Sequence, residues 1–136
     1  LANAKENYDT CSKKLIKINN QIDETSSYLN VYREKVKNGV KLTPENMKLI
    51  KQYNEKLDEL NNERGDKNER LLAIRQELEK GNYLLNEEKF QAGIISKFDL
   101  LRYEENLLSL EKQLDAYKTS RFMNFIGLYK STGSQI

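Results

Sequence analysis

Two short segments of this chain each place a helix-ending glycine a few residues before a helix-starting hydroxyl residue. Gly39 is followed by Thr43 and Pro44, and Gly93 is followed by Ser96. Glycine adopts the left-handed conformation that ends a helix without a Cβ penalty. The Ser or Thr oxygen then caps the next helix, and proline suits its first position. Each segment therefore predicts a tight reversal between two antiparallel helices.

The two segments form a repeat. Gly39 lies 54 positions before Gly93, and Thr43 lies 53 positions before Ser96. Glu45 and Asp99 follow the two capping residues, where negative charge complements the helix dipole. The sequence therefore predicts two copies of a helical hairpin. A plain connector in a helical bundle would need the same residues, and this interpretation stays open.

Apolar side chains at spacings of three and four residues predict four helices with coiled-coil seams. The first seam contains Tyr8, Cys11, Leu15, Ile18, Ile22, Thr25, Leu29, Tyr32 and Val36. The second contains Met47, Ile50, Tyr53, Leu57 and Leu60, and the third contains Leu71, Ile74, Leu78, Leu85 and Ala92, with Gly81 between them. The fourth contains Leu100, Tyr103, Leu107, Leu110, Leu114, Tyr117 and Leu128. This helix also has a second apolar stripe, which predicts a second neighbouring helix. The stripe contains Leu101, Leu108, Phe122, Phe125 and Tyr129.

The predicted fold class is all-α, an antiparallel four-helix coiled-coil bundle made of two repeated hairpins. Residues 1–64 form the first hairpin, with its turn near 39–43, and residues 68–133 form the second, with its turn near 93–96. Gly65 and Asp66 interrupt the pattern, so residues 65–67 are expected to be a short linker. Both glycine turns would then lie at one end of the bundle.

Composition argues against several classes of function. Charged residues make up 32% of the chain, as in long solvated helices, and 23 basic and 21 acidic residues leave a net charge of only +2. We therefore expect binding neither to nucleic acid nor to an anionic membrane surface. No run approaches the roughly 20 apolar residues of a membrane-spanning helix. The first residues do not resemble a signal peptide, so any such peptide is expected to have been removed.

Catalysis is not expected either. The chain has no histidine, which removes the commonest general base and zinc ligand. Its acidic pairs, at 87–88 and 104–105, lie among basic residues as on a solvated helix face. The single cysteine, Cys11, lies on a seam and is interpreted as a small buried hydrophobic residue. We expect no enzyme activity, metal site or cofactor.

Residues 83–133 resemble the C-terminal helical hairpin of the TolC-like outer-membrane efflux channel family. One motif is Phe-Gln-Ala-Gly-Ile-Ile-Ser at 90–96, followed by Phe-Asp-Leu-Leu at 98–101, and the other is Ile-Gly-Leu-Tyr-Lys-Ser-Thr-Gly at 126–133. The resemblance implies the periplasmic tip of a homotrimeric channel for multidrug efflux or type I secretion, within an outer-membrane protein. At that tip the hairpins of a periplasmic adaptor protein dock. Gly93, Ser96 and Asp99 match the second tip and Gly39 and Thr43 match the first, and we expect Val40 and Ile94 to join the contact.

The spacing of the two turns departs from that family, in which a long segment with membrane-barrel strands separates the hairpins. The short separation here suggests a natural tip that has been truncated and rejoined through an engineered linker. Such a chain would be helical and either monomeric or weakly trimeric by itself. A structural coiled-coil scaffold or interaction module unrelated to transport is the alternative. The two readings differ in whether the second stripe needs lateral partners.

Overall fold

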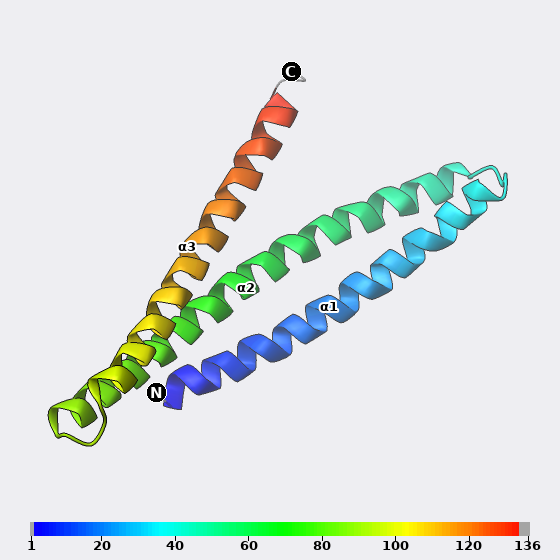
Figure 1. The fold of residues 1–136 in the computed structure, drawn as a ribbon. Coiled ribbons are helices and arrows are strands. Elements are labelled where there is room, and N and C mark those ends of the chain that lie inside the picture. The colour runs from blue at the N-terminus through cyan, green and yellow to red at the C-terminus, as the bar shows by residue number, and fades with distance from the viewer. Residues whose placement is uncertain (1, 134–136) are drawn as a thin grey trace. The chain divides into compact units, whose positions relative to one another are not determined.

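The computed structural model describes the backbone of residues 2–133 and the side chains of residues 3–124. Three long helices, α1 (Ala2–Lys37), α2 (Pro44–Gln91) and α3 (Lys97–Gly133), account for nearly all of it, and these residues contain no strand (Figure 1). The two connections, at 38–43 and 92–96, contain the two predicted glycine turns. The all-α fold class is therefore confirmed.

The expected linker at residues 65–67 is wrong. These residues are helical, and the predicted second and third helices are one helix of 48 residues. Because α2 is continuous, the two glycine turns come at its two ends. The chain reversal expected at Gly65, on which the prediction of a shared end for the two turns depended, is therefore wrong.

The seam of α2 explains why Gly65 does not end the helix. Leu60 and Ile74 stand two full heptads apart, so the apolar pattern keeps its phase across Gly65 and Asp66. Both side chains are almost fully buried, with exposed fractions of 2% and 1%. Glycine inside a helix costs only about 1 kcal/mol relative to alanine, whereas burying one such side chain contributes roughly 2 kcal/mol. Packing on both sides of Gly65 therefore outweighs its low helix propensity.

The chain divides into two compact units, one formed by Ser12–Asn68 and the other by Leu1–Cys11 together with Glu69–Ile136. In the Ser12–Asn68 unit, the predicted seam of α1 is buried at Leu15, Ile18, Thr25 and Leu29. The rings of Tyr28 and Tyr53 lie 5.3 Å apart and join α1 to α2. The buried Thr25 hydroxyl donates a hydrogen bond to the carbonyl oxygen of Gln21 at 2.8 Å, which explains how a polar residue fits this seam.

The other unit contains parts of all three helices. Its core is formed by Ala4, Cys11 and Ile74, with Tyr8, Leu71 and Leu78 packed against them. The predicted burial of Cys11 is thus confirmed. From α3, the unit buries Leu100, Leu110 and Leu114. The Arg121 guanidinium donates to the Glu69 carboxylate at 2.7 Å and so connects α3 to α2.

The predicted seams fail near both ends of α2. Leu85 and Ala92 are exposed, and so are Met47 near the start of α2 and Val36 in the last turn of α1. The buried position beside Leu85 is Asn86, which is 5% exposed and whose amide donates to the Asn82 carbonyl oxygen at 2.8 Å. A purely apolar pattern missed this position because the buried residue is polar.

Candidate docking site

The Gly93 turn is closed by a complete set of backbone hydrogen bonds. The Gly93 amide donates to the Phe90 carbonyl at 3.0 Å, and the Ile94 amide donates to the Lys89 carbonyl at 2.8 Å. This pair of bonds defines a Schellman motif, which requires a left-handed residue at the glycine. Gly93 meets that requirement with φ of 76°. The predicted role of Gly93 in ending the helix is confirmed.

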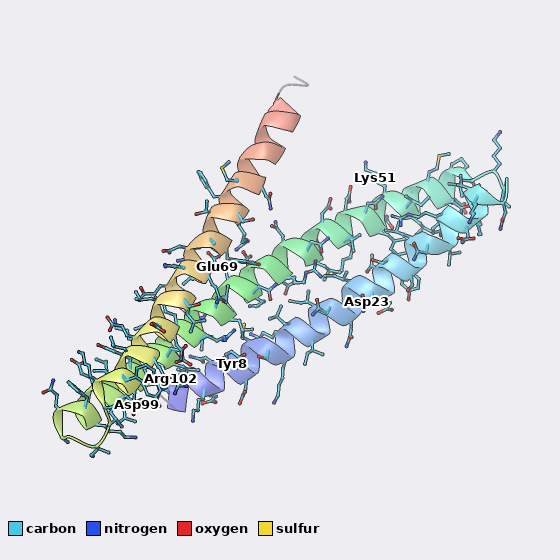
Figure 2. All side chains as sticks on the ribbon, in the orientation of Figure 1. Tyr8, Asp23, Lys51, Glu69, Asp99 and Arg102 are labelled. Atoms are coloured by element: carbon cyan, nitrogen blue, oxygen red, sulfur yellow. The ribbon has the colours of Figure 1, made fainter. Side chains whose placement is uncertain are left out.

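Ser96 caps α3 as predicted. The Asp99 amide donates to the Ser96 Oγ at 3.1 Å, and the Leu100 amide donates to the Ser96 carbonyl at 3.1 Å. Asp99 lies in the first turn of α3, where its charge complements the helix dipole. Figure 2 places Asp99 and Arg102 together at this end of α3. The turn is therefore fixed on both sides, by a C-cap and an N-cap.

The closed turn presents apolar side chains to solvent. In a Schellman motif the residue after the glycine usually packs against an apolar residue five positions earlier. That position is Lys89 here, and Ile94 is left 71% exposed. Phe98, in the first turn of α3, is 72% exposed. Two large apolar side chains therefore stand exposed at a turn whose backbone is hydrogen-bonded, and together they can contribute to an interaction surface.

A polar recess of about 320 Å³ lies where the turn meets α3. It is lined by Ile95, Asp99, Arg102, Tyr103 and Asn106, all from the turn and the first three turns of α3. The apolar tip thus has neighbouring groups that can donate and accept hydrogen bonds. Protein interfaces combine apolar contacts with such polar groups.

The Gly39 turn repeats the same backbone geometry. Its Schellman bonds run from the Gly39 amide to the Val36 carbonyl at 3.0 Å and from the Val40 amide to the Lys35 carbonyl at 2.9 Å. Gly39 has φ of 78°. The repeat that the sequence predicts is thus confirmed at the level of hydrogen bonds.

The cap after the Gly39 turn is reciprocal. The Asn46 amide donates to the Thr43 Oγ1 at 3.1 Å, and the Thr43 amide donates to the Asn46 Oδ1 at 3.3 Å. This arrangement is a capping box in which Asn takes the place of the usual Glu or Gln. Pro44 is the first residue of α2, as predicted.

The structure divides the predicted contact residues into two groups. Gly93, Ile94, Ser96 and Asp99 form one turn, whereas Gly39, Val40 and Thr43 form the other, in a different compact unit. The sequence reading did not single out Phe98 or Met47 as surface features. Phe98 and Met47 both lie near the start of a helix, before its buried stripe begins, and this position could have indicated that they are exposed.

The second apolar stripe of α3 is exposed where the structure describes it. Leu101, Leu108 and Phe122 all face solvent, while the first stripe is buried at Leu100 and Leu114. The side chains of Phe125 and Tyr129, and that of Leu128 in the first stripe, lie outside the described part. α3 thus buries one face within its own unit and leaves a second one uncovered.

Tyr83, in the last third of α2, is placed between carboxylates. Partial burial raises the pKa of its phenol, and Glu87 on α2 and Glu104 on α3 raise it further. Each of these effects disfavours the phenolate form of Tyr83. Tyr83, Asn86 and Phe90, at spacings of three and four, are at least half-buried, while Leu84 and Leu85 are exposed.

Among residues 2–133, no helix is long and apolar enough to cross a membrane, and no group of side chains has the composition to hold a metal ion. In comparisons with known proteins, no family model, no curated protein and no solved structure matches this chain.

Proposed function

We propose that this chain is part of the periplasmic helical tip of a TolC-like outer-membrane channel, serving multidrug efflux or type I secretion, and that it docks the helical hairpins of a periplasmic adaptor protein. The observation that carries the proposal is the Gly93 turn. Its backbone is closed by caps on both sides, and its apolar side chains, Ile94 and Phe98, are presented to solvent. The same residues carry the resemblance to the channel family.

The docking surface is assigned to the Gly93 turn alone. Shared docking by both turns depended on a chain reversal at residues 65–67, and these residues are helical. The closing motif at 126–133 also belongs to the hairpin that contains Gly93. The proposed adaptor-docking surface therefore does not include Gly39, Val40 and Thr43.

The exposed stripe on α3 supports the channel assignment over a closed bundle. A tube wall needs helices that contact a neighbour on each side, and Leu101 and Leu108 provide a second apolar face beyond the buried one. In the complete channel this face would contact a neighbouring hairpin of the homotrimer. A coiled-coil scaffold is the other candidate, because an uncovered apolar stripe suits any lateral helical partner.

The test changes the presented surface and leaves the turn intact. In Ile94→Asp, the Ile94 amide still bonds to Lys89 and Gly93 keeps its conformation, so helix content and melting temperature should not change. Binding to the isolated hairpin of a cognate adaptor should fall by at least tenfold, because a charge replaces an apolar contact at the centre of the interface. Surface plasmon resonance with the immobilised hairpin measures this directly.

Ile16→Asp is the matched control, because Ile16 is also an exposed isoleucine but belongs to α1 in the other compact unit. This variant should bind the adaptor hairpin as the parent does. If Ile94→Asp binds equally well and also supports export in cells, the docking proposal fails and the scaffold reading is favoured.

A further inference from the structure

The two turns have the same backbone geometry but opposite charge. The segment 33–51, around Gly39, contains six basic and two acidic side chains, a net charge of +4. The equivalent segment 87–105, around Gly93, contains three basic and five acidic side chains, a net charge of −2. The whole chain has a net charge of +2, so the basic character of the Gly39 turn is local.

The basic side chains around Gly39 are exposed and are not neutralised by carboxylates. All six are on the surface: Arg33, Lys35, Lys37, Lys41, Lys48 and Lys51. Among the described residues, none of them has a carboxylate within ion-pair distance, and Arg33 instead donates to the Asn30 side-chain oxygen. The hairpin brings the basic residues of α1 and α2 to the same end of the Ser12–Asn68 unit (Figure 1).

Apolar side chains are interleaved with these charges. Val36, Val40 and Met47 are 57%, 51% and 59% exposed. Val40 follows the glycine of the Schellman motif, and its usual apolar partner position is Lys35, so Val40 points outward like Ile94 in the other turn. Behind the tip, Leu29, Val36, Leu42 and Ile50 line most of an apolar recess of about 270 Å³.

We infer that the tip of the first hairpin, residues 33–51, is a docking surface for an anionic phospholipid bilayer. Excess lysine attracts acidic headgroups by long-range electrostatics. Exposed Val and Met side chains on the same tip can enter the boundary between headgroups and acyl chains, where a basic and apolar surface is most stable. A nucleic acid would satisfy the charges but would leave these apolar side chains in water. This inference does not depend on the adaptor-docking proposal, which concerns the Gly93 turn.

The test measures partition of the whole chain onto vesicles by flotation. The parent should bind vesicles of phosphatidylcholine mixed equally with phosphatidylglycerol and should not bind pure phosphatidylcholine. High salt should weaken the binding because it screens the headgroup charge. Each lysine near an anionic surface contributes about 1 kcal/mol, so removing three should lower the partition coefficient about 100-fold. The tip variant carries Lys35→Gln, Lys37→Gln and Lys41→Gln.

The control removes the same charge from exposed positions farther along α1, with Lys13→Gln, Lys14→Gln and Lys17→Gln. These positions are about 27 Å or more from Lys35 along the helix, well beyond the screening length of about 8 Å at physiological salt. The control should therefore bind vesicles within a few-fold of the parent. A third variant, Val40→Asp, should reduce binding at least tenfold.

Three results would overturn the inference. The parent could fail to bind anionic vesicles, in which case the basic tip serves an acidic protein or another ligand. The tip variant and the control could lose binding equally, which would show a response to net charge alone. Val40→Asp could lose no more binding than Val31→Asp, a matched exposed valine before the tip, which would exclude insertion by Val40. Circular dichroism should show unchanged helix content in every variant.

Discussion

Glycine-to-alanine substitutions at Gly65 and Gly93 should change stability in opposite directions. Gly93 has φ of 76°, which an L residue adopts at a cost of about 1 kcal/mol or somewhat more. No heavy atom lies within 4 Å of the position where its Cβ would be, so this backbone strain is the whole expected cost. Gly65 lies inside α2, where alanine is favoured over glycine by about 1 kcal/mol.

The two variants should therefore differ by about 2 kcal/mol in the free energy of unfolding. An unfolding entropy of about 2.1 cal/mol/K per residue over 136 residues converts 1 kcal/mol into a shift of roughly 3–4 °C in melting temperature. Gly65→Ala should melt above the parent and Gly93→Ala below it by about that amount. Urea titrations followed by circular dichroism should show the same order of midpoints with little change in slope.

Gly39→Ala provides an internal control, because Gly39 has φ of 78° and also has open space around it. It should cost as much as Gly93→Ala. The decisive measurement is the sign at Gly65. A destabilisation of about 1 kcal/mol there, accompanied by non-helical NMR chemical shifts at residues 65–67, would refute the continuity of α2 and what is inferred from it.

Other substitutions test individual contacts. Ser96→Ala should destabilise the protein by about 1 kcal/mol through the lost cap of α3, as measured by urea titration. Leu60→Ala should cost about 3 kcal/mol because it opens a cavity at a fully buried site, whereas Leu49→Ala, at a partly exposed site of the same helix, should cost much less. The Tyr28 phenol donates to the Glu24 Oε1 at 2.8 Å, and this bond, with the carboxylate charge, raises the pKa of Tyr28. The stabilisation from this bond should be present below the ordinary tyrosine pKa and be lost as the pH rises through the raised pKa of Tyr28. NMR titration of the Tyr28 ring should give a lower pKa in Glu24→Gln than in the parent. An unchanged pKa would exclude the bond to Glu24 as the cause of the shift.

Local backbone chemistry could be predicted from the sequence with little error. The glycine turns, their caps and the proline at the start of α2 depend on residues within a few positions of one another. Their bonds form as expected at Gly39 and Thr43 and at Gly93 and Ser96. The first seam of α1 was also predicted well, because regular spacing leaves one face to bury.

The sequence analysis predicted a break in α2 at Gly65 because it gave more weight to the Gly65-Asp66 pair than to the heptad spacing on either side of it. Gly65 and Asp66 look like a turn by themselves, yet Leu60 and Ile74 stay in heptad phase across them. A turn would have reset that phase. The sequence does contain a signal for a continuous helix, but this signal extends over two full heptads and passes through seam positions occupied by charged side chains.

The chemical character of the two tips follows from the sequence, because composition alone gives the Gly39 turn its positive charge and the Gly93 turn its negative charge. Which apolar side chains stay uncovered was decided by tertiary structure. Val40 and Ile94 are exceptions, because the lysine five positions before each of them is already visible in the sequence. Leu85 is exposed and Asn86 is buried. The spacing of apolar residues indicates which few positions of a helix are candidates for burial. The surface of the adjacent helix then decides which of two neighbouring residues, such as Leu85 and Asn86, is buried.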